Sequence, residues 1–135
     1  MWKCLENPNN EVRDVVIVTV PWTDSSMPLM APAVLRPVVE KTGHSCLAID
    51  LNVEIYHWTR QHADQQDLIR FFFDEYISTK TGPILHQMLL SIAQGIVSWH
   101  PKYVGLSLFS YVCQHSAKWI AYYIKKLNPN IKIIC

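Results

Sequence analysis

The sequence predicts an α/β protein of the three-layer, doubly wound type, Rossmann-like or flavodoxin-like, with a short parallel sheet. Apolar runs of strand length alternate with segments whose apolar residues recur at helical spacing, in the order β-α-β-(αα)-β-α-β. The run at residues 14–21 is apolar at successive positions, which is typical of a strand covered on both faces. Alternation of this kind implies right-handed crossovers and helices on both faces of the sheet.

The first half of the pattern contains two strands and one helix. After the strand at 14–21 and a polar loop, a helix is expected to run to about Thr42, with Gly43 as its stop signal. Pro37 lies inside this helix, and a kink or local break is expected there because proline removes a backbone donor. A second strand follows at 44–51.

The second half begins with a long helical stretch. Apolar residues at helical spacing there predict core-facing helices, and the same spacing returns before the chain ends. The predicted elements are helices at 53–62, 66–77 and 84–97, a strand at 101–110, a helix at 114–127 and a fourth strand at 131–135.

We divide the chain into a polar N-terminal arm, residues 1–13, and an α/β domain, residues 14–135, with a helical insertion at 53–100. The sequence stops within the predicted fourth strand, and an open strand edge exposes unpaired backbone groups. Two explanations fit this: a domain truncated after its fourth strand, as in a fragment of a longer chain, or an edge covered by another copy. A fragment is favoured, and it is expected to self-associate through that edge.

Composition excludes several classes of protein. The 135 residues fit one domain, half of them are hydrophobic, and the formal charge of +1 is too small to predict nucleic-acid or anionic-membrane binding. No apolar run approaches the roughly 20 residues of a membrane span, and residues 1–13 do not resemble a signal peptide. We therefore expect a soluble, cytoplasmic protein. Its four scattered cysteines predict free thiols, and its histidines lack metal-ligand spacing.

Ligands of open parallel sheets bind beyond the carboxyl ends of the strands. The segments that meet there carry hydroxyls and aromatic rings, which suit hydrogen bonding to amides or phosphate beside a flat ring. No glycine-rich phosphate loop and no catalytic constellation accompany them. The alternative is that the serines and aspartates only cap helices or bond within the sheet. The candidate binding residues are Trp22, Thr23, Asp24, Ser25, Ser26, Asp50, Asn52, Ser107, Phe109, Ser110 and Tyr111.

Five segments resemble the N-terminal part of the cobalamin-binding radical-SAM proteins. In that family a strand ending in proline precedes a helix, a Gly-His turn and an Asp-Leu-Asn segment, and the third strand ends in a serine-rich turn. The corresponding segments here are residues 20–22, 27–35, 41–44, 49–56 and 104–110, so the resemblance covers nearly the whole chain.

The resemblance implies a corrinoid-binding module of a methyltransferase-like radical-SAM enzyme, with Trp22–Ser26 and Ser107–Tyr111 facing the corrin ring and its nucleotide tail. The Asp-x-His-x-x-Gly motif, which supplies a cobalt-ligating histidine in other cobalamin proteins, is absent here as it is in many radical-SAM relatives, and this implies cobalt without a protein histidine. The Gly-Gly expected after the fourth strand and the Cys-x3-Cys-x2-Cys cluster are also absent. The iron–sulfur cluster and S-adenosylmethionine would therefore belong to a radical-SAM core elsewhere in the parent chain, and this piece alone would not catalyse a reaction.

Two other interpretations stay open. A flavodoxin-like domain could hold FMN between the loops after the first and third strands, with Trp22 and Tyr111 stacked on the ring. A cofactor-free regulatory or interaction domain of the receiver type would need acidic residues after the first strand, but Asp14 precedes that strand instead.

Overall fold

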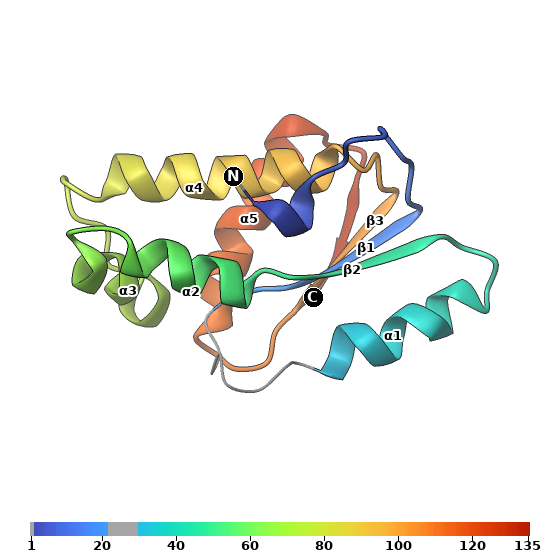
Figure 1. Cartoon of the computed structure of the whole chain (residues 1–135), viewed down its shortest axis with the longest axis horizontal. Coiled ribbons are helices and arrows are strands. Elements are labelled where there is room, and N and C mark those ends of the chain that lie inside the picture. Colours follow the sequence, from blue (N-terminus) through green and yellow to red (C-terminus); the bar gives the residue numbers. More distant parts are fainter. Residues whose placement is uncertain (1, 22–29) are drawn as a thin grey trace.

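The structure is a computed structural model that describes residues 2–21 and 30–135 (Figure 1). It confirms the predicted α/β class and the alternation of strands and helices, with three helices between the second and third strands. The elements are a short 3-10 helix η1 (Lys3–Leu5), β1 (Val15–Thr19), α1 (Met30–Glu40), β2 (Cys46–Asp50), α2 (Asn52–Arg60), α3 (Gln65–Asp74), α4 (Gly82–Val97), β3 (Tyr103–Ser107), α5 (Cys113–Leu127) and β4 (Lys132–Ile134).

The four strands form one parallel sheet in the order β2-β1-β3-β4. β1 is central, as its uninterrupted apolar run predicted, and it pairs with β2 on one side and β3 on the other. At its last residue, Thr19 is in register with both Asp50 and Ser107. The carboxyl ends of three strands therefore lie side by side at one edge of the sheet.

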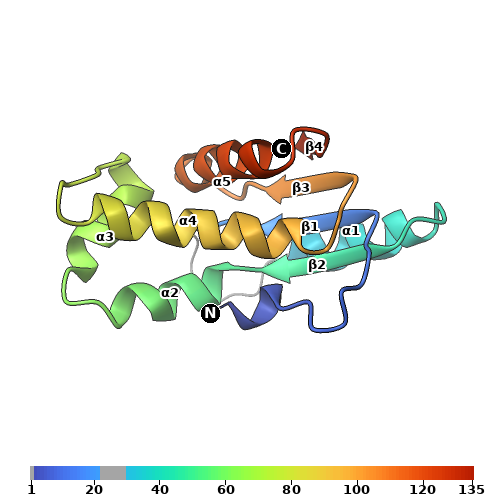
Figure 2. The same ribbon diagram turned by 90° about the horizontal axis from the view of Figure 1, so that it is seen from above.

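The two faces of the sheet are covered unequally. Val16 and Val18 point to the face that carries α4 and α5, which we call the core face, and both are completely buried there. Val15 and Ile17 point to the opposite face, which we call the α1 face. In Figure 2 α4 lies in front of the sheet and α1 behind it. Among the described helices, only α1 packs against the α1 face.

The hydrophobic core lies between the core face and the long helices. Residues Leu85, Met88, Leu89, Ile92 and Ile96 of α4 are all buried, which confirms the apolar stripe predicted at 84–97. α4 packs along α5, and α3 adds two buried aromatic rings, Phe71 and Phe72. Such burial against the sheet is the main source of stability in a domain of this size.

The N-terminal segment, predicted as a polar arm, is attached to this core by two apolar side chains. Trp2 and Leu5 are buried, and the Trp2 ring nitrogen donates to Ser91 Oγ in α4 at 2.7 Å. The Trp99 ring nitrogen donates to the Leu5 carbonyl, and Glu54 of α2 accepts from the Cys4 backbone N–H. Residues 2–5 therefore join α2 and α4.

The predicted break in α1 does not occur. Pro37 lies inside the helix, which continues to Glu40, so the helix ends two residues before the expected Thr42. Gly43 has a φ of 84°, in the left-handed region that favours glycine, and this confirms the predicted stop. α1 has little to hold it down: Pro32 is its only fully buried residue with a described side chain.

A polar clamp holds the opposite, amino-terminal edge of the sheet. Asp14 accepts hydrogen bonds from the backbone N–H and hydroxyl of Ser45 at 3.0 Å, and from the Lys102 ammonium at 2.9 Å. These groups precede β1, β2 and β3. The pKa of Asp14 is lowered, first by the hydrogen bond from Lys102 and then by those from Ser45.

None of the helices in the described residues is both long and apolar enough to cross a bilayer.

We predict that Phe72→Ala lowers the free energy of unfolding by about 3–5 kcal/mol, because a completely buried ring leaves a cavity. Phe73→Ala is the matched control. The Phe73 ring is 44% exposed, so its removal should lower the free energy of unfolding by less than about 1 kcal/mol. Urea denaturation followed by circular dichroism gives both values. Equal losses for the two variants would contradict the burial described here.

The clamp predicts a loss of stability in acid. A carboxyl whose pKa is lower in the folded state stabilises that state above its ordinary pKa of about 3.9, and the contribution is lost as the pH falls below that value. Asp14→Asn should therefore be less stable than the native protein near neutrality and less sensitive to pH below about 4. Urea midpoints measured from about pH 7 to about pH 3 test this. If the urea midpoints of the two proteins fell equally with pH below about 4, the proposed role of Asp14 would be excluded.

Candidate functional site

The carboxyl edge of the sheet brings together part of the predicted binding set. Asp50 is the last residue of β2 and Ser107 the last residue of β3, and each is in register with Thr19 on the central strand. By strand alternation all three side chains lie on the α1 face. The predicted residues Trp22, Thr23, Asp24, Ser25 and Ser26 lie outside the described residues.

The remaining predicted residues differ in how accessible they are. Asp50 is exposed, and its Oδ1 accepts a hydrogen bond from the Asn52 backbone N–H at 2.9 Å, which fixes the turn into α2. Asn52 is buried as the first residue of α2, so its side chain is not on the open surface of this edge. Of the two predicted hydrogen-bonding groups in this segment, only the Asp50 carboxylate is open to a ligand.

The loop from β3 to α5 presents two aromatic rings. Phe109 and Tyr111 are both strongly exposed there. Ser110 has a local structural contact instead: its carbonyl accepts from the Cys113 backbone N–H at 3.1 Å, and its hydroxyl lies 3.8 Å from the Cys113 sulfur. These contacts hold the first turn of α5. Phe109 and Tyr111 are therefore the members of this segment best placed to contact a molecule at the edge.

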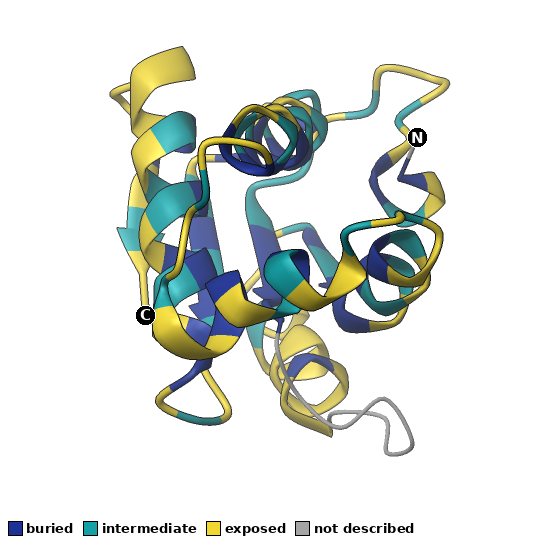
Figure 3. Ribbon diagram, turned by 90° about the vertical axis from the view of Figure 1, so that its left-hand side faces the viewer, coloured by how far each residue is buried: buried dark blue, intermediate teal, exposed yellow. Residues whose placement is uncertain are grey.

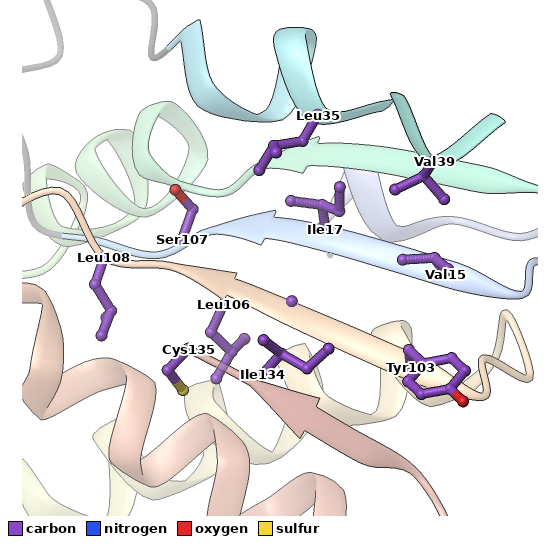
Figure 4. Close-up of a pocket in the computed structure, with 11 residues that line it drawn as sticks. Val15, Ile17, Leu35, Val39, Tyr103, Leu106, Ser107, Leu108, Ile134 and Cys135 are labelled. Carbon is purple, nitrogen blue, oxygen red and sulfur yellow. The ribbon is translucent and has the colours of Figure 1, made fainter. Parts of the chain in front are cut away.

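An apolar groove of about 340 Å³ lies on the α1 face, alongside α1 (Figure 4). Leu35 and Val39 of α1 form one wall, and β1 and β3 form the floor. Ile134 of β4 lies on the far side, and Ser107 marks the end at the carboxyl edge. None of the described side chains that line the groove is charged.

Gly105 keeps the floor of this groove open. It is the middle residue of β3, on the α1 face between Tyr103 and Ser107. A Cβ atom at Gly105 would contact only the Ile17 side chain, at 3.7 and 3.9 Å, so the position has room for a side chain. Glycine within a strand weakens it and often marks a close approach by a ligand or another backbone. Packing against neighbouring residues therefore does not require a glycine at this position. The missing side chain leaves its space to the groove.

Thr19 is an unexpected polar residue beside this site. Its side chain is completely buried, and its hydroxyl has no hydrogen-bond partner among the described residues. A buried hydroxyl without a partner is costly, so it is a feature that needs a reason. Thr19 and Gly105 are not among the residues predicted for the site. The available signals were one hydroxyl in an otherwise apolar strand and one glycine inside another.

A second polar cluster joins α3 to α5, away from the groove. The Glu75 carboxylate forms an ion pair with Lys118 and lies 3.4 Å from His115 Nδ1. The hydrogen bond from Lys118 is the main cause of the lowered pKa of Glu75. Glu75 follows α3 in a left-handed conformation with a φ of 54°. The cluster holds the end of α3 against α5, which accounts for its contacts without a ligand.

Neither of these regions forms a metal centre. Within residues 2–21 and 30–135, no group of three or more His, Cys, Asp or Glu side chains is placed to hold a metal ion.

No family model, no curated protein and no solved structure matches the chain. The arrangement at the carboxyl edge therefore has to be interpreted from its own chemistry. It combines an apolar groove, the Ser107 hydroxyl at one end of that groove, the Asp50 carboxylate on the same edge of the sheet beyond β1, and two exposed aromatic rings on the adjoining loop.

Proposed function

We propose that this domain binds a corrinoid, cobalamin, at the carboxyl edge of its sheet, with the nucleotide tail in the groove beside α1. The main support is the groove itself, which begins beside Ser107 and is kept open by Gly105. Its lining is apolar and uncharged, so it suits a flat aromatic base at the end of a tail. It suits a phosphate poorly, because phosphate binding uses cations and directed N–H donors, so only the base of the tail would lie in the groove and the phosphodiester of the tail would stay in solvent.

The residues around the groove fit the rest of a corrinoid. A corrin ring carries many amide side chains, for which Ser107 and Asp50 offer an uncharged hydroxyl and an accepting carboxylate. The exposed rings of Phe109 and Tyr111 offer flat apolar surfaces at the same edge. These side chains would bind and orient the corrinoid, and the bound cobalt would supply its capacity to carry a methyl group.

On this proposal the domain is a binding module of a larger cytoplasmic enzyme. The cobalt would have no histidine ligand from an Asp-x-His-x-x-Gly motif, because the sequence lacks that motif. The iron–sulfur cluster and S-adenosylmethionine would be held by a radical-SAM core in the same parent chain, where the reaction would take place. The domain's own task would be to hold the corrinoid with one face open to that core.

The proposal predicts that the protein retains hydroxocobalamin through a desalting column and shows its visible absorption bands. FMN treated in the same way should be lost, because the described lining of the groove has no cation for its phosphate. Absorbance spectra of the eluted protein decide between the two ligands. Retained flavin with no retained corrin would replace this proposal by the flavodoxin-like one, and loss of both ligands would refute cobalamin binding.

Gly105→Val tests the groove separately from the edge. The valine side chain would fill the floor of the groove, and valine is favoured in strands, so thermal stability should be unchanged or higher. Affinity for cobalamin should fall at least about tenfold, a change of about 1.4 kcal/mol. Affinity for cobinamide, a corrinoid without the nucleotide tail, should change little.

Ser107→Leu is the companion variant, because Ser107 lies at the edge, where both ligands would bind. It should weaken cobalamin and cobinamide alike. Binding titrations followed by absorbance measure all four affinities. If Gly105→Val weakened cobinamide as much as cobalamin, the groove would not be the site of the tail.

A further inference from the structure

α1 carries an apolar stripe that is exposed to solvent. Ala31, Val34, Leu35 and Val38 recur at i, i+3, i+4 and i+7, so they share one face of the helix. All four are exposed, and Val38 is 55% exposed although it is a β-branched apolar residue. α1, at the bottom of Figure 3, is accordingly almost entirely yellow.

The charged residues of α1 lie on its other flank. Arg36 Nε donates to Glu40 Oε1 at 2.9 Å, and neither residue lines the groove. The stripe faces the opposite way, toward the groove, because Leu35 and its neighbour Val39 line the groove wall. The stripe and the groove therefore form one continuous apolar surface, which extends to Ile134, itself 59% exposed on β4.

We propose that two copies of this chain associate face to face through this surface, with α1 of each copy lying in the groove of the other. The surface is complementary to itself because it places a projecting helix next to a groove on the same face. A twofold axis parallel to the strands would carry α1 of one copy over β3 and β4 of the other. The two α1 helices would then lie side by side and parallel, with their stripes in contact.

The dimensions suit this arrangement. An 11-residue helix is about 16 Å long, and packed helices have axes about 8–10 Å apart, so one added helix can lie beside α1 over the two uncovered strands. Burying the stripe, Ile134 and the groove lining would remove on the order of 600 Å² per copy, against roughly 800 Å² in a standard interface. An interface at the low end of the standard size is typical of weak, reversible association.

Charge also favours the second copy as the occupant. α1 runs antiparallel to the strands, so its C-terminal end and Glu40 lie near the amino-terminal edge of the sheet. The proposed axis would bring this end over β4 of the other copy, where Lys132 lies on the α1 face opposite Tyr103. Lys132 would then form an ion pair with Glu40 of the other copy. It would also interact favourably with the negative, C-terminal end of the α1 dipole. The rest of the surface is uncharged.

This interface differs from association through the β4 edge, which would join the two sheets by backbone hydrogen bonds and leave both grooves empty. It would also exclude a ligand tail from the groove. Cobalamin binding and face-to-face association would then oppose each other, although the association itself does not depend on the proposed function.

Sedimentation velocity from about 1 to about 200 µM protein tests the proposal, over the range expected for an interface of this size. The native chain should shift from monomer to dimer. Val38→Lys should weaken dimerisation at least tenfold, and it should fold normally because the side chain is exposed and lysine is a good helix former. Val12→Lys is the matched control, since Val12 is 63% exposed and does not line the groove, and it should dimerise like the native chain.

Charge reversal tests the pairing of the two copies. Lys132→Glu should weaken the dimer, and adding Glu40→Lys in the same chain should restore it, because each copy then carries both reversed charges. A native chain that stays monomeric at about 200 µM would overturn the proposal and indicate a different occupant for the groove. A dimer unaffected by Val38→Lys would overturn it in favour of the β4 edge. If circular dichroism shows Val38→Lys to be unfolded, Val34→Lys takes its place.

Discussion

The parallel pairing of β1 with both β2 and β3 is the constraint on which the rest of this structure depends. The crossover from β1 to β2 moves outward in one direction, and those from β2 to β3 and from β3 to β4 move in the other. Because such crossovers are right-handed, the first places its helix on one face and the later ones place theirs on the other. Among the described elements α1 is thus alone on its face, and α4 and α5 enclose the core on the opposite face.

The strands and helices were predictable because their apolar patterns are local. The unbroken run before Thr19 identified a central strand, and the helical stripe around Met88 identified a helix packed on the sheet. The role of the N-terminal segment was not predictable from its polar composition. Trp2 is held by Ser91, 89 residues away, and no local pattern specifies a contact of that separation.

The candidate site was only partly predictable, for a related reason. Asp50 and Ser107 could be assigned to one edge because the carboxyl ends of parallel strands meet there. The groove depends on where α1 lies across the sheet, on how much of β3 it leaves uncovered, and on the missing side chain at Gly105. These are properties of packing between elements. Asn52 was predicted to contact a ligand because it is a polar residue that follows a strand. It is instead buried at the start of α2, and its type and position alone do not distinguish the two roles.

The unequal covering of the sheet also implies unequal protection against hydrogen exchange. α1 has one fully buried residue and a proline that cannot donate a backbone hydrogen bond, whereas α4 has seven buried residues. Opening of α1 would expose little apolar surface, so its amides should exchange through local fluctuations. Amides of α4 should exchange only when the whole domain unfolds. The single helix on the α1 face would then be the least stable unit of the fold and the one whose protection rises most when that face is covered.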